Sequence, residues 1–273
     1  MNKIGVAYNV FDGIENLPIS INQIKPYVDY ITVVYQDFSN VGNSISKINK
    51  FILEVLFANK VIDNLILYEP KGNDLHNNEC CKRNIGLQDC ISNNCNYFIS
   101  MDCDEIYDGL KFAQEYLNIK EKKIDKSFNS YCYIQDYYSS GKLKYRKLAN
   151  YFVPFIAKID SKSTFNMGNP ELKYIDPTRR VWSKNTSNLP ILINSDNIVM
   201  DHLTMVRANI KSLKEKFINS SSPEYRNSNS FDDYAMSIFN YHKDNNINLK
   251  IYQEVADKYD TEKVYKSFNQ IEI

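Results

Sequence analysis

The first hundred residues alternate between segments typical of buried strands and segments typical of helices. Short apolar stretches bounded by polar residues predict strands at residues 3–8, 30–35, 61–68 and 97–101. Apolar residues at helical spacing predict helices at residues 16–28, 43–59 and 77–92. Parallel strands need a crossover connection, which is usually a helix, so the alternation predicts a mostly parallel sheet with helices on both faces. We therefore expect a fold of the α/β class.

The second half of the chain has a different pattern. After a predicted helix at 107–117, β-branched and aromatic residues predict strands at 128–138, 144–147, 151–159, 181–182, 191–193 and 198–200. The turn residues at 139–141 favour a hairpin, so antiparallel strands are expected beside the parallel ones. Helical patterns return at 206–218 and 231–241. We expect one domain over residues 1–273, whose last part, 206–273, is helical.

Composition and charge narrow the class of protein. The 33 basic and 33 acidic residues argue against nucleic-acid binding, which needs a cationic surface to displace counterions. No apolar run approaches the roughly 20 residues of a membrane helix, and the chain starts directly on a strand rather than on a signal peptide. The six cysteines lack the paired spacing of a zinc site, which favours free thiols in a reducing compartment. These features predict a soluble, cytoplasmic protein.

Two carboxylates directly follow the fourth predicted strand. Asp102 and Asp104 stand one residue apart, and side chains at i and i+2 of an extended segment point the same way. Two like charges this close repel, and a hard divalent cation shared with phosphate oxygens is the usual remedy. Ligands of open α/β sheets bind beyond the carboxyl ends of the strands, so we expect the site here. The alternative is an acidic turn that only favours the start of the next helix.

This acidic turn resembles the Asp-x-Asp motif of GT-A glycosyltransferases, in the form found among relatives of glycosyltransferase family 2. Three other segments resemble that family in the same order: residues 6–9, its first strand; residues 82–87, its Arg-Asn-x-Gly helix; and residues 201–207, its late segment with a metal-binding histidine. The similarity extends over about residues 3–210. It implies a GT-A (Rossmann-like) fold in which residues 1–106 bind a nucleotide and residues 107–205 face the acceptor.

The resemblance implies a metal site and a nucleotide-sugar donor. Asp104 would bind Mn²⁺ or Mg²⁺ directly, while Asp102 would contact the ribose or bind the metal through water. His202 would complete the metal shell, and an imidazole ligand suits Mn²⁺ better than a site made only of oxygens. The metal would bridge the diphosphate and offset charge on the departing nucleotide.

The same resemblance implies contacts to the rest of the donor. Lys82 or Arg83 would add fixed positive charge near the diphosphate. Tyr8 would pack on the base, and Asp37 would lie near the base or the ribose. Ordinary packing of Tyr8, one of 21 tyrosines, and a solvated helix face for Arg83 are the alternatives.

The chain departs from the family at the catalytic base. An inverting enzyme needs a carboxylate to deprotonate the acceptor hydroxyl, and family 2 members usually place it in a Glu-Asp pair after the Asp-x-Asp segment. No such pair occurs there in this sequence. Asp136 and Glu171 are the candidates, with a surface role as the alternative for each.

Transfer of a sugar from a nucleoside diphosphate donor, UDP-linked by preference, to a saccharide or other hydroxyl acceptor is the expected function. A second class is another metal-dependent phosphate enzyme, such as a nucleotidyltransferase, which would share the acidic strand end. Such an enzyme would be expected to have a glycine-rich phosphate loop after the first strand, and residues 8–12 do not form one. A third class is a non-catalytic sugar-binding module on the same scaffold.

Overall fold

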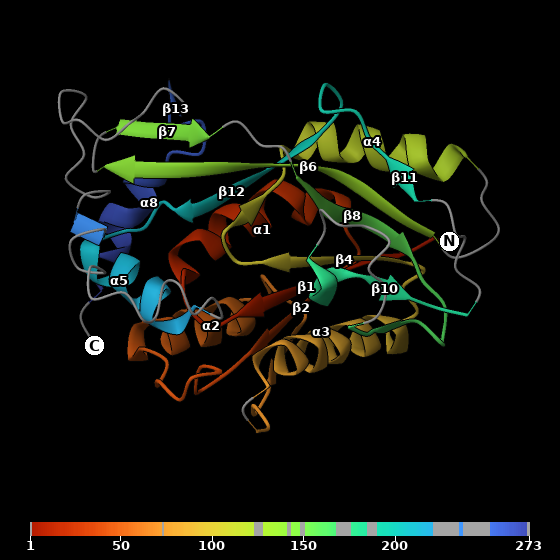
Figure 1. The fold of residues 1–273 in the computed structure, drawn as a ribbon, viewed down its shortest axis with the longest axis horizontal. Helices are drawn as coiled ribbons and strands as arrows, with labels where there is room; N and C mark the ends of the chain where they lie inside the picture. Colours follow the sequence, from red (N-terminus) through yellow and green to blue (C-terminus); the bar gives the residue numbers. More distant parts are fainter. Residues whose placement is uncertain are drawn as a thin grey trace.

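One sheet of eleven strands organises the part of the chain that the structure describes (Figure 1). The structure is a computed structural model, and it describes residues 2–72, 74–122, 128–140, 143–147, 151–167, 176–184, 190–220, 235–236 and 252–271. The strands of this sheet are β1 (Ile4–Val10), β2 (Tyr30–Tyr35), β3 (Asn64–Leu67), β4 (Tyr97–Asp102), β5 (Glu105–Ile106), β6 (Phe128–Ser140), β7 (Leu143–Lys147), β8 (Phe152–Lys158), β11 (Ile191–Leu192), β12 (Val199–Met205) and β13 (Tyr252–Val255). A separate antiparallel pair consists of β9 (Thr164–Phe165) and β10 (Val181–Trp182).

The sheet has a parallel part and an antiparallel part. Strands β3, β2, β1 and β4 pair in parallel in that order. Beyond β4, the strands β8, β6, β7 and β13 follow in antiparallel pairs, while β12 pairs in parallel with β6 and antiparallel with β5. The predicted α/β class, with parallel strands first and antiparallel strands later, is confirmed.

Helices cover both faces of the parallel part. The described helices are α1 (Leu17–Ile24), α2 (Lys47–Ala58), α3 (Leu75–Ser92), α4 (Gly109–Glu121), α5 (Ile210–Asn219) and α8 (Thr261–Phe268), with 3-10 turns η1 (Ile14–Asn16), η2 (Lys25–Tyr27) and η3 (Pro177–Arg179). Successive side chains of β1 point to opposite faces, as a strand requires. Val6 and Tyr8 join the core with α1, α2 and α4, whereas Ala7 packs with α3.

A glycine allows α3 to pack closely against the sheet. A Cβ atom at Gly86 would lie 2.5 Å from the Cβ of Ala7 in β1 and 3.3 Å from a methyl group of Val34 in β2. Real Cβ atoms essentially never approach other heavy atoms as closely as the first of these distances, so a side chain at position 86 would force α3 away from β1. The close packing brings the first half of α3 to the carboxyl ends of the parallel strands.

Two predicted helices begin later than expected, and side-chain caps explain both starts. Helix α2 begins at Lys47 because the Ser46 hydroxyl accepts a hydrogen bond from the Asn49 backbone N–H, at 3.1 Å. The strand predicted at 198–200 continues to Met205, so α5 begins only at Ile210, where Asn209 is the cap. The helix predicted at 231–241 lies almost wholly outside the described residues.

The C-terminal region is not only helical, contrary to the prediction. Strand β13 lies within it and pairs antiparallel with β7, which extends the edge of the sheet. Helix α8 follows β13, and its Tyr265 hydroxyl donates a hydrogen bond to the Asn16 side chain at 2.5 Å. Among the helices of the described residues, none has both the length and the hydrophobicity needed to cross a membrane.

Candidate functional site

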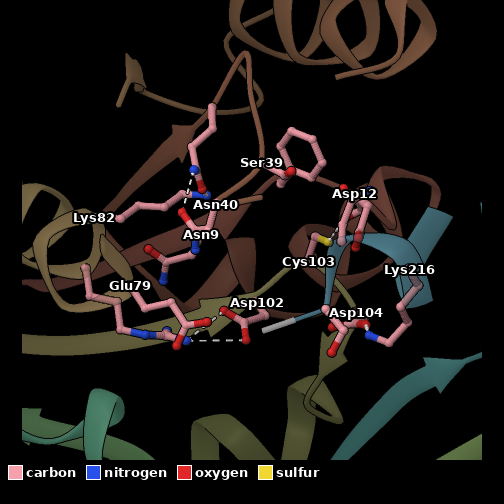
Figure 2. A pocket seen from close by; sticks show the side chains of 15 residues that line it. Asn9, Asp12, Ser39, Asn40, Glu79, Lys82, Asp102, Cys103, Asp104 and Lys216 are labelled. Carbon is pink, nitrogen blue, oxygen red and sulfur yellow. Dashed lines mark hydrogen bonds and ion pairs between the residues drawn. The ribbon is translucent and has the colours of Figure 1, made fainter. Parts of the chain in front are cut away.

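A cavity of about 250 Å³ lies at the carboxyl ends of three parallel strands (Figure 2). Asn9 near the end of β1, Gln36 just after β2 and Asp102 at the end of β4 all line it. Strand β1 lies between β2 and β4. The chain therefore continues from β1 to β2 and β3 on one side of β1 and then returns to form β4 on the other side of β1. Open α/β sheets bind ligands at this kind of topological switch point. The position of the cavity therefore follows from the strand order.

Both aspartates of the acidic turn line this cavity, on either side of a buried cysteine. Figure 2 shows Asn9 and Lys82 on one side of it and Asp104 and Lys216 on the other. The thiol of Cys103 lies 2.8 Å from the Asp12 carbonyl oxygen, to which it donates a hydrogen bond. Burial raises the pKa of this thiol well above its ordinary value, so Cys103 is not an activated nucleophile.

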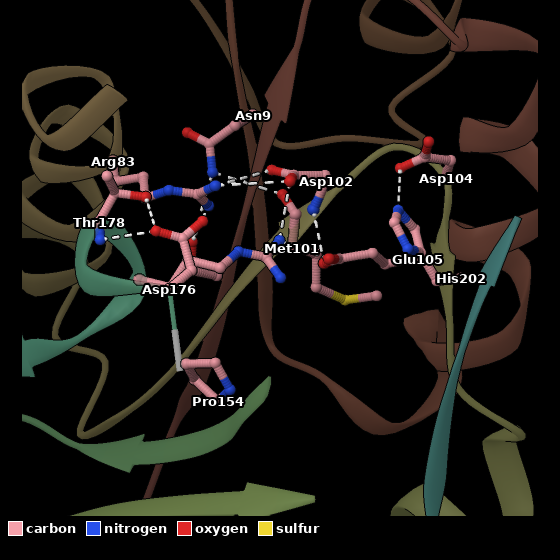
Figure 3. A network of polar contacts seen from close by, with 12 residues as sticks. Asn9, Arg83, Met101, Asp102, Asp104, Glu105, Pro154, Asp176, Thr178 and His202 are labelled. Atoms are coloured by element: carbon pink, nitrogen blue, oxygen red, sulfur yellow. Dashed lines mark hydrogen bonds and ion pairs between the residues drawn. The ribbon is translucent and has the colours of Figure 1, made fainter. Parts of the chain in front are cut away.

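Asp102 is held by two arginines, one of which, Arg83, is labelled in Figure 3. Its carboxylate lies 3.2 Å from Nη2 of Arg83, in α3, and 2.8 Å from Nη2 of Arg179, in η3. Burial raises the pKa of Asp102, but the guanidinium groups of Arg179 and Arg83 outweigh it and hold the pKa below its ordinary value. Arg179 also forms an ion pair with the buried Glu105. Asp102 is thus an ionised group whose charge is already offset by the protein.

Asp104 has a different set of partners. Its Oδ2 lies 2.7 Å from Nη2 of the fully buried Arg207 and 3.0 Å from Nζ of Lys216 in α5. Burial raises the pKa of Asp104, but Lys216, His202 and Arg207 together hold it well below its ordinary value. Because both cations lie at Oδ2, the other oxygen, Oδ1, is left facing His202.

His202 lies between two carboxylates. In β12 it is in register with Asp136 of the neighbouring strand β6. Its Nδ1 lies 2.8 Å from Oδ1 of Asp136. Its Nε2 lies 3.6 Å from Oδ1 of Asp104, a contact drawn in Figure 3. Burial lowers the pKa of His202, but the carboxylates of Asp104 and Asp136 outweigh this and raise it to about 9. The arrangement fixes the imidazole ring and directs Nε2 toward Asp104.

The expected metal set of Asp102, Asp104 and His202 is not assembled in the structure. Among the described residues, no group of three or more His, Cys, Asp or Glu side chains is placed to hold a metal ion. Two donors fit a metal ion once binding displaces the proton from His202: Oδ1 of Asp104 and Nε2 of His202, with Asp136 in the role of the carboxylate that orients a metal-binding histidine. Asp102 does not fit as a direct ligand, because Arg83 and Arg179 occupy its oxygens.

The two cationic residues predicted near the diphosphate both line the cavity. The Nζ atom of Lys82 donates to the Val10 carbonyl and to Oε1 of Gln36, each at 2.8 Å. Arg83 donates to the Ser100 hydroxyl at 3.0 Å as well as to Asp102. Burial lowers the pKa of Lys82 to about 7, with a further contribution from the neighbouring Arg83. Near neutral pH, Lys82 therefore exchanges between the charged and the neutral form.

The structure places Tyr8 in the core and not at the ligand. Its side chain is 0% exposed, and its hydroxyl forms a hydrogen bond of 2.8 Å with Ser20. The physical reason is the alternation of a strand: residue 8 points to the face of α1, whereas Asn9 points to the face of α3 and lines the cavity. The predicted packing of Tyr8 on a base is therefore replaced by a cavity-lining position for Asn9.

The remaining predicted site residues lie elsewhere. Asp37 forms an ion pair with Lys50 at 2.9 Å and lines an adjoining cavity of about 560 Å³. The two cavities share Ser39 and Asn40, so Asp37 is near the site without facing its acidic turn. Asp136, a candidate base, accepts hydrogen bonds from Tyr151 at 3.0 Å and contacts Nδ1 of His202, so its carboxylate fixes the orientation of the imidazole ring. Glu171, the other candidate, lies outside the described residues.

Two cations at the acidic turn had no signal in the sequence. Arg179 reaches Asp102 from 77 residues away, and Lys216 reaches Asp104 from 112 residues away. Neither belongs to a motif, and a single sequence does not report contacts between such distant segments. The 3-10 turn η3, between β9 and β10, brings Arg179 to the acidic turn, and helix α5, after β12, brings Lys216.

Comparisons with known proteins add little to this geometry. No family model and no curated protein matches the sequence. Among solved structures, TarS of S. aureus is similar at 10% identity with a TM-score of 0.43, over 87% of this chain and 42% of that chain. Mannose-1-phosphate geranyltransferase of Thermus thermophilus is similar at 10% identity with a TM-score of 0.33, over 98% of this chain and 68% of that chain. The chain thus spans less than half the length of TarS, and these scores carry no argument about function.

Proposed function

We propose that the cavity binds a nucleoside diphosphate sugar and that the protein transfers the sugar to a hydroxyl acceptor. The observation that carries this proposal is the convergence of cationic and acidic side chains at the switch point of a parallel sheet. Lys82, Arg83 and Lys216 approach it from two different helices and bring N–H donors suited to phosphate oxygens. The resemblance of the acidic turn to an Asp-x-Asp motif supports the same function.

Lys216 is the cation best suited to respond to a ligand. Its Nζ atom lies 3.0 Å from Asp104, and its side chain is 22% exposed, on a flexible stem at the cavity wall. A bound diphosphate would offer the ammonium group a second partner. Arg207, by contrast, is fully buried and donates to the Leu203 carbonyl at 2.6 Å as well as to Asp104, so it keeps the turn in place.

A divalent cation remains part of the proposal. Asp104 and His202 would hold Mn²⁺ or Mg²⁺ through Oδ1 and Nε2, and phosphate oxygens of the donor would supply further ligands. When bound, such an ion would offset negative charge on the departing nucleoside diphosphate. Asp136 would orient the imidazole, because its carboxylate already holds Nδ1 at 2.8 Å.

Thermal melting with UDP, in the presence and absence of Mn²⁺, tests the binding step. We expect UDP and Mn²⁺ together to raise the melting temperature more than the sum of their separate effects, because a ligand that binds only the folded state stabilises it. Asp104→Asn and His202→Gln should each abolish this joint effect. Asp196→Asn removes a charge from an exposed residue outside the site and should retain it.

The transfer step needs a separate measurement. A panel of nucleotide sugars with saccharide acceptors should release UDP in the original protein and not in Asp104→Asn. In a parallel assay with a nucleoside triphosphate and a sugar 1-phosphate, release of pyrophosphate would instead identify a nucleotidyltransferase. Binding of UDP without turnover of any donor would favour the non-catalytic module. In the melting experiment, an identical response to UDP and Mn²⁺ in Asp104→Asn, in His202→Gln and in the original protein would refute the metal assignment.

A further inference from the structure

Helix α3 ends in a motif that brings two cysteines together, at the end of the helix far from the cavity. The Cys95 N–H donates to the Cys90 carbonyl at 3.0 Å, and the Asn94 N–H donates to the Ile91 carbonyl at 2.9 Å. Asn94 has a left-handed φ of 61°. These two bonds and this residue define a Schellman motif, in which the side chains three residues before and two residues after the C-cap regularly touch. Cys90 and Cys95 occupy those two positions.

Both sulfur atoms lie over Gly5 of the first strand. A Cβ atom at Gly5 would lie 2.7 Å from Sγ of Cys90 and 2.8 Å from Sγ of Cys95. Since both sulfurs are this close to one point, they are no more than about 5.5 Å apart. Their residues are 0% and 6% exposed. The missing side chain at position 5 provides the space for the pair.

The two thiols differ in their ionisation. The neighbouring Cys90 thiol and the nearby Lys3 outweigh the effect of burial and lower the pKa of Cys95, whereas burial raises the pKa of Cys90 well above its ordinary value. Lys3 is held in place by a 3.0 Å hydrogen bond from its Nζ to the Asn93 carbonyl. Because the thiolate is the reactive form, Cys95 is the better nucleophile and Cys90 the better resolving thiol.

We propose that Cys90 and Cys95 are a modification site, a dithiol that a peroxide oxidises to an intramolecular disulfide. The Cys95 thiolate would attack one peroxide oxygen, which breaks the O–O bond, forms a sulfenic acid and releases hydroxide that is protonated to water. The Cys90 sulfur would then attack the Cys95 sulfur and break its S–O bond; the leaving hydroxyl group takes up the Cys90 thiol proton and departs as a second water. In sum, two thiols and one hydrogen peroxide give one disulfide and two waters.

The disulfide would tie the end of α3 to the segment that enters β4. Both elements carry cavity residues, but at their opposite ends: Lys82 and Arg83 lie in the first half of α3, and Asp102 lies at the end of β4. The proposal is therefore independent of the proposed sugar transfer, and either can fail without the other.

Oxidation of the full folded chain, followed by thiol mapping, tests the pair. The reduced protein is treated with hydrogen peroxide, denatured and alkylated, and alkylated cysteines are counted by mass spectrometry. We expect alkylation at all six cysteines before oxidation and the loss of two, Cys90 and Cys95, after it. Fragmentation of the tryptic peptide from Asn84 to Lys111, which also contains Cys103, locates the bond.

Matched variants separate this pair from the other thiols. Cys95→Ser should abolish the disulfide, and Cys95→Ala, which removes the polar atom, should do the same if the serine variant folds poorly. Cys81→Ser changes an exposed cysteine and should leave the disulfide intact. The proposal fails if Cys90 and Cys95 stay reduced, if they form the bond only after denaturation, or if either one pairs instead with another cysteine or is oxidised only to a sulfonic acid.

Discussion

The parallel half and the later half of the chain contribute different things to the same cavity. The parallel half supplies its walls: Asn9, Lys82 and Asp102 lie on β1, α3 and β4, all within the first 102 residues. The later half supplies most of the charges that neutralise the acidic turn, through Arg179 and Lys216. The position of the site is thus a property of strand order, whereas its electrostatics depend on segments that are distant in sequence.

The separate origins of the acidic turn and of its cations indicate how the turn is stabilised. Asp102 and Asp104 are adjacent carboxylates in a partly buried turn, a costly arrangement unless cations lie beside them. Each aspartate has its own arginine from the later half, Arg179 for the first and Arg207 for the second. Folding of the later half is therefore expected to be a condition for a stable acidic turn, even though the turn itself belongs to the parallel half.

Replacing Arg207 should have the largest effect. Arg207→Ala leaves Asp104 buried beside one remaining ammonium group and removes donors to the Leu203 and Val206 carbonyls. Loss of one partner of a buried ion pair costs about 3–5 kcal/mol. We expect the free energy of unfolding, measured by urea denaturation, to fall by about this amount.

Arg207→Lys is the control for charge. A lysine keeps the positive charge but lacks the forked donors, so we expect a loss smaller than that of the alanine variant. A change of less than about 1 kcal/mol in Arg207→Ala, the range of an exposed ion pair, would show that the later half does not stabilise the acidic turn as described.

The second prediction concerns the parallel half and the pH dependence of donor binding. Burial lowers the pKa of Lys82 from its ordinary value of 10.5 to about 7. A bound diphosphate favours the ammonium form, so binding takes up a proton once the pH exceeds 7. UDP affinity, measured by calorimetry, should therefore fall above pH 7, by at most about tenfold per pH unit. The Lys82→Gln variant should bind more weakly and show a flatter profile.

The lowered pKa of Lys82 also makes the free energy of unfolding depend on pH, but this quantity rises with pH where UDP affinity falls. Between pH 7 and 10.5 the unfolded chain keeps the proton on Lys82 while the folded chain has lost it. The unfolded state then binds more protons, so this residue makes the free energy of unfolding rise with pH across that window. If the pH profiles of UDP binding and of unfolding are the same in Lys82→Gln as in the original protein, Lys82 does not titrate in the cavity.

The smallest effect is expected for Tyr8. Tyr8→Phe removes the hydroxyl that bonds to Ser20 and keeps the buried ring. The free energy of unfolding should fall by about 1 kcal/mol, the usual value for one hydrogen bond. UDP affinity should not change, because the residue is in the core. A variant with normal stability and weakened UDP binding would place Tyr8 at the ligand after all.

Much of the fold could be predicted from the sequence because local patterns and tertiary environment agree in the parallel half. The strand at residues 30–35 is rich in β-branched and aromatic residues, and it is β2 in the structure, between β1 and β3. Strand β13 had no such signal. It is short, and its place in the sheet depends on pairing with β7, a contact between segments about a hundred residues apart. Local patterns carry no information about that pairing.

The candidate site was partly predictable for the same reason. The end of the fourth strand is a local feature that indicates Asp102 and Asp104, and the family resemblance indicates Lys82 and Arg83; all four line the cavity. The face on which a side chain lies depends on strand register, and a shift of one residue exchanges Tyr8 for Asn9. The contact of Asp136 with His202 arises from the pairing of β12 with β6, which no local pattern contains.

Gly86 links the packing of α3 to the charge of the cavity. It follows Lys82 by four residues and Arg83 by three, so all three lie on one side of the helix. The 2.5 Å approach of its missing Cβ to Ala7 sets the height of α3 above the sheet, and with it the reach of both cations. A single added methyl group at position 86 would therefore move Lys82 and Arg83 away from the cavity, although Gly86 itself does not line it.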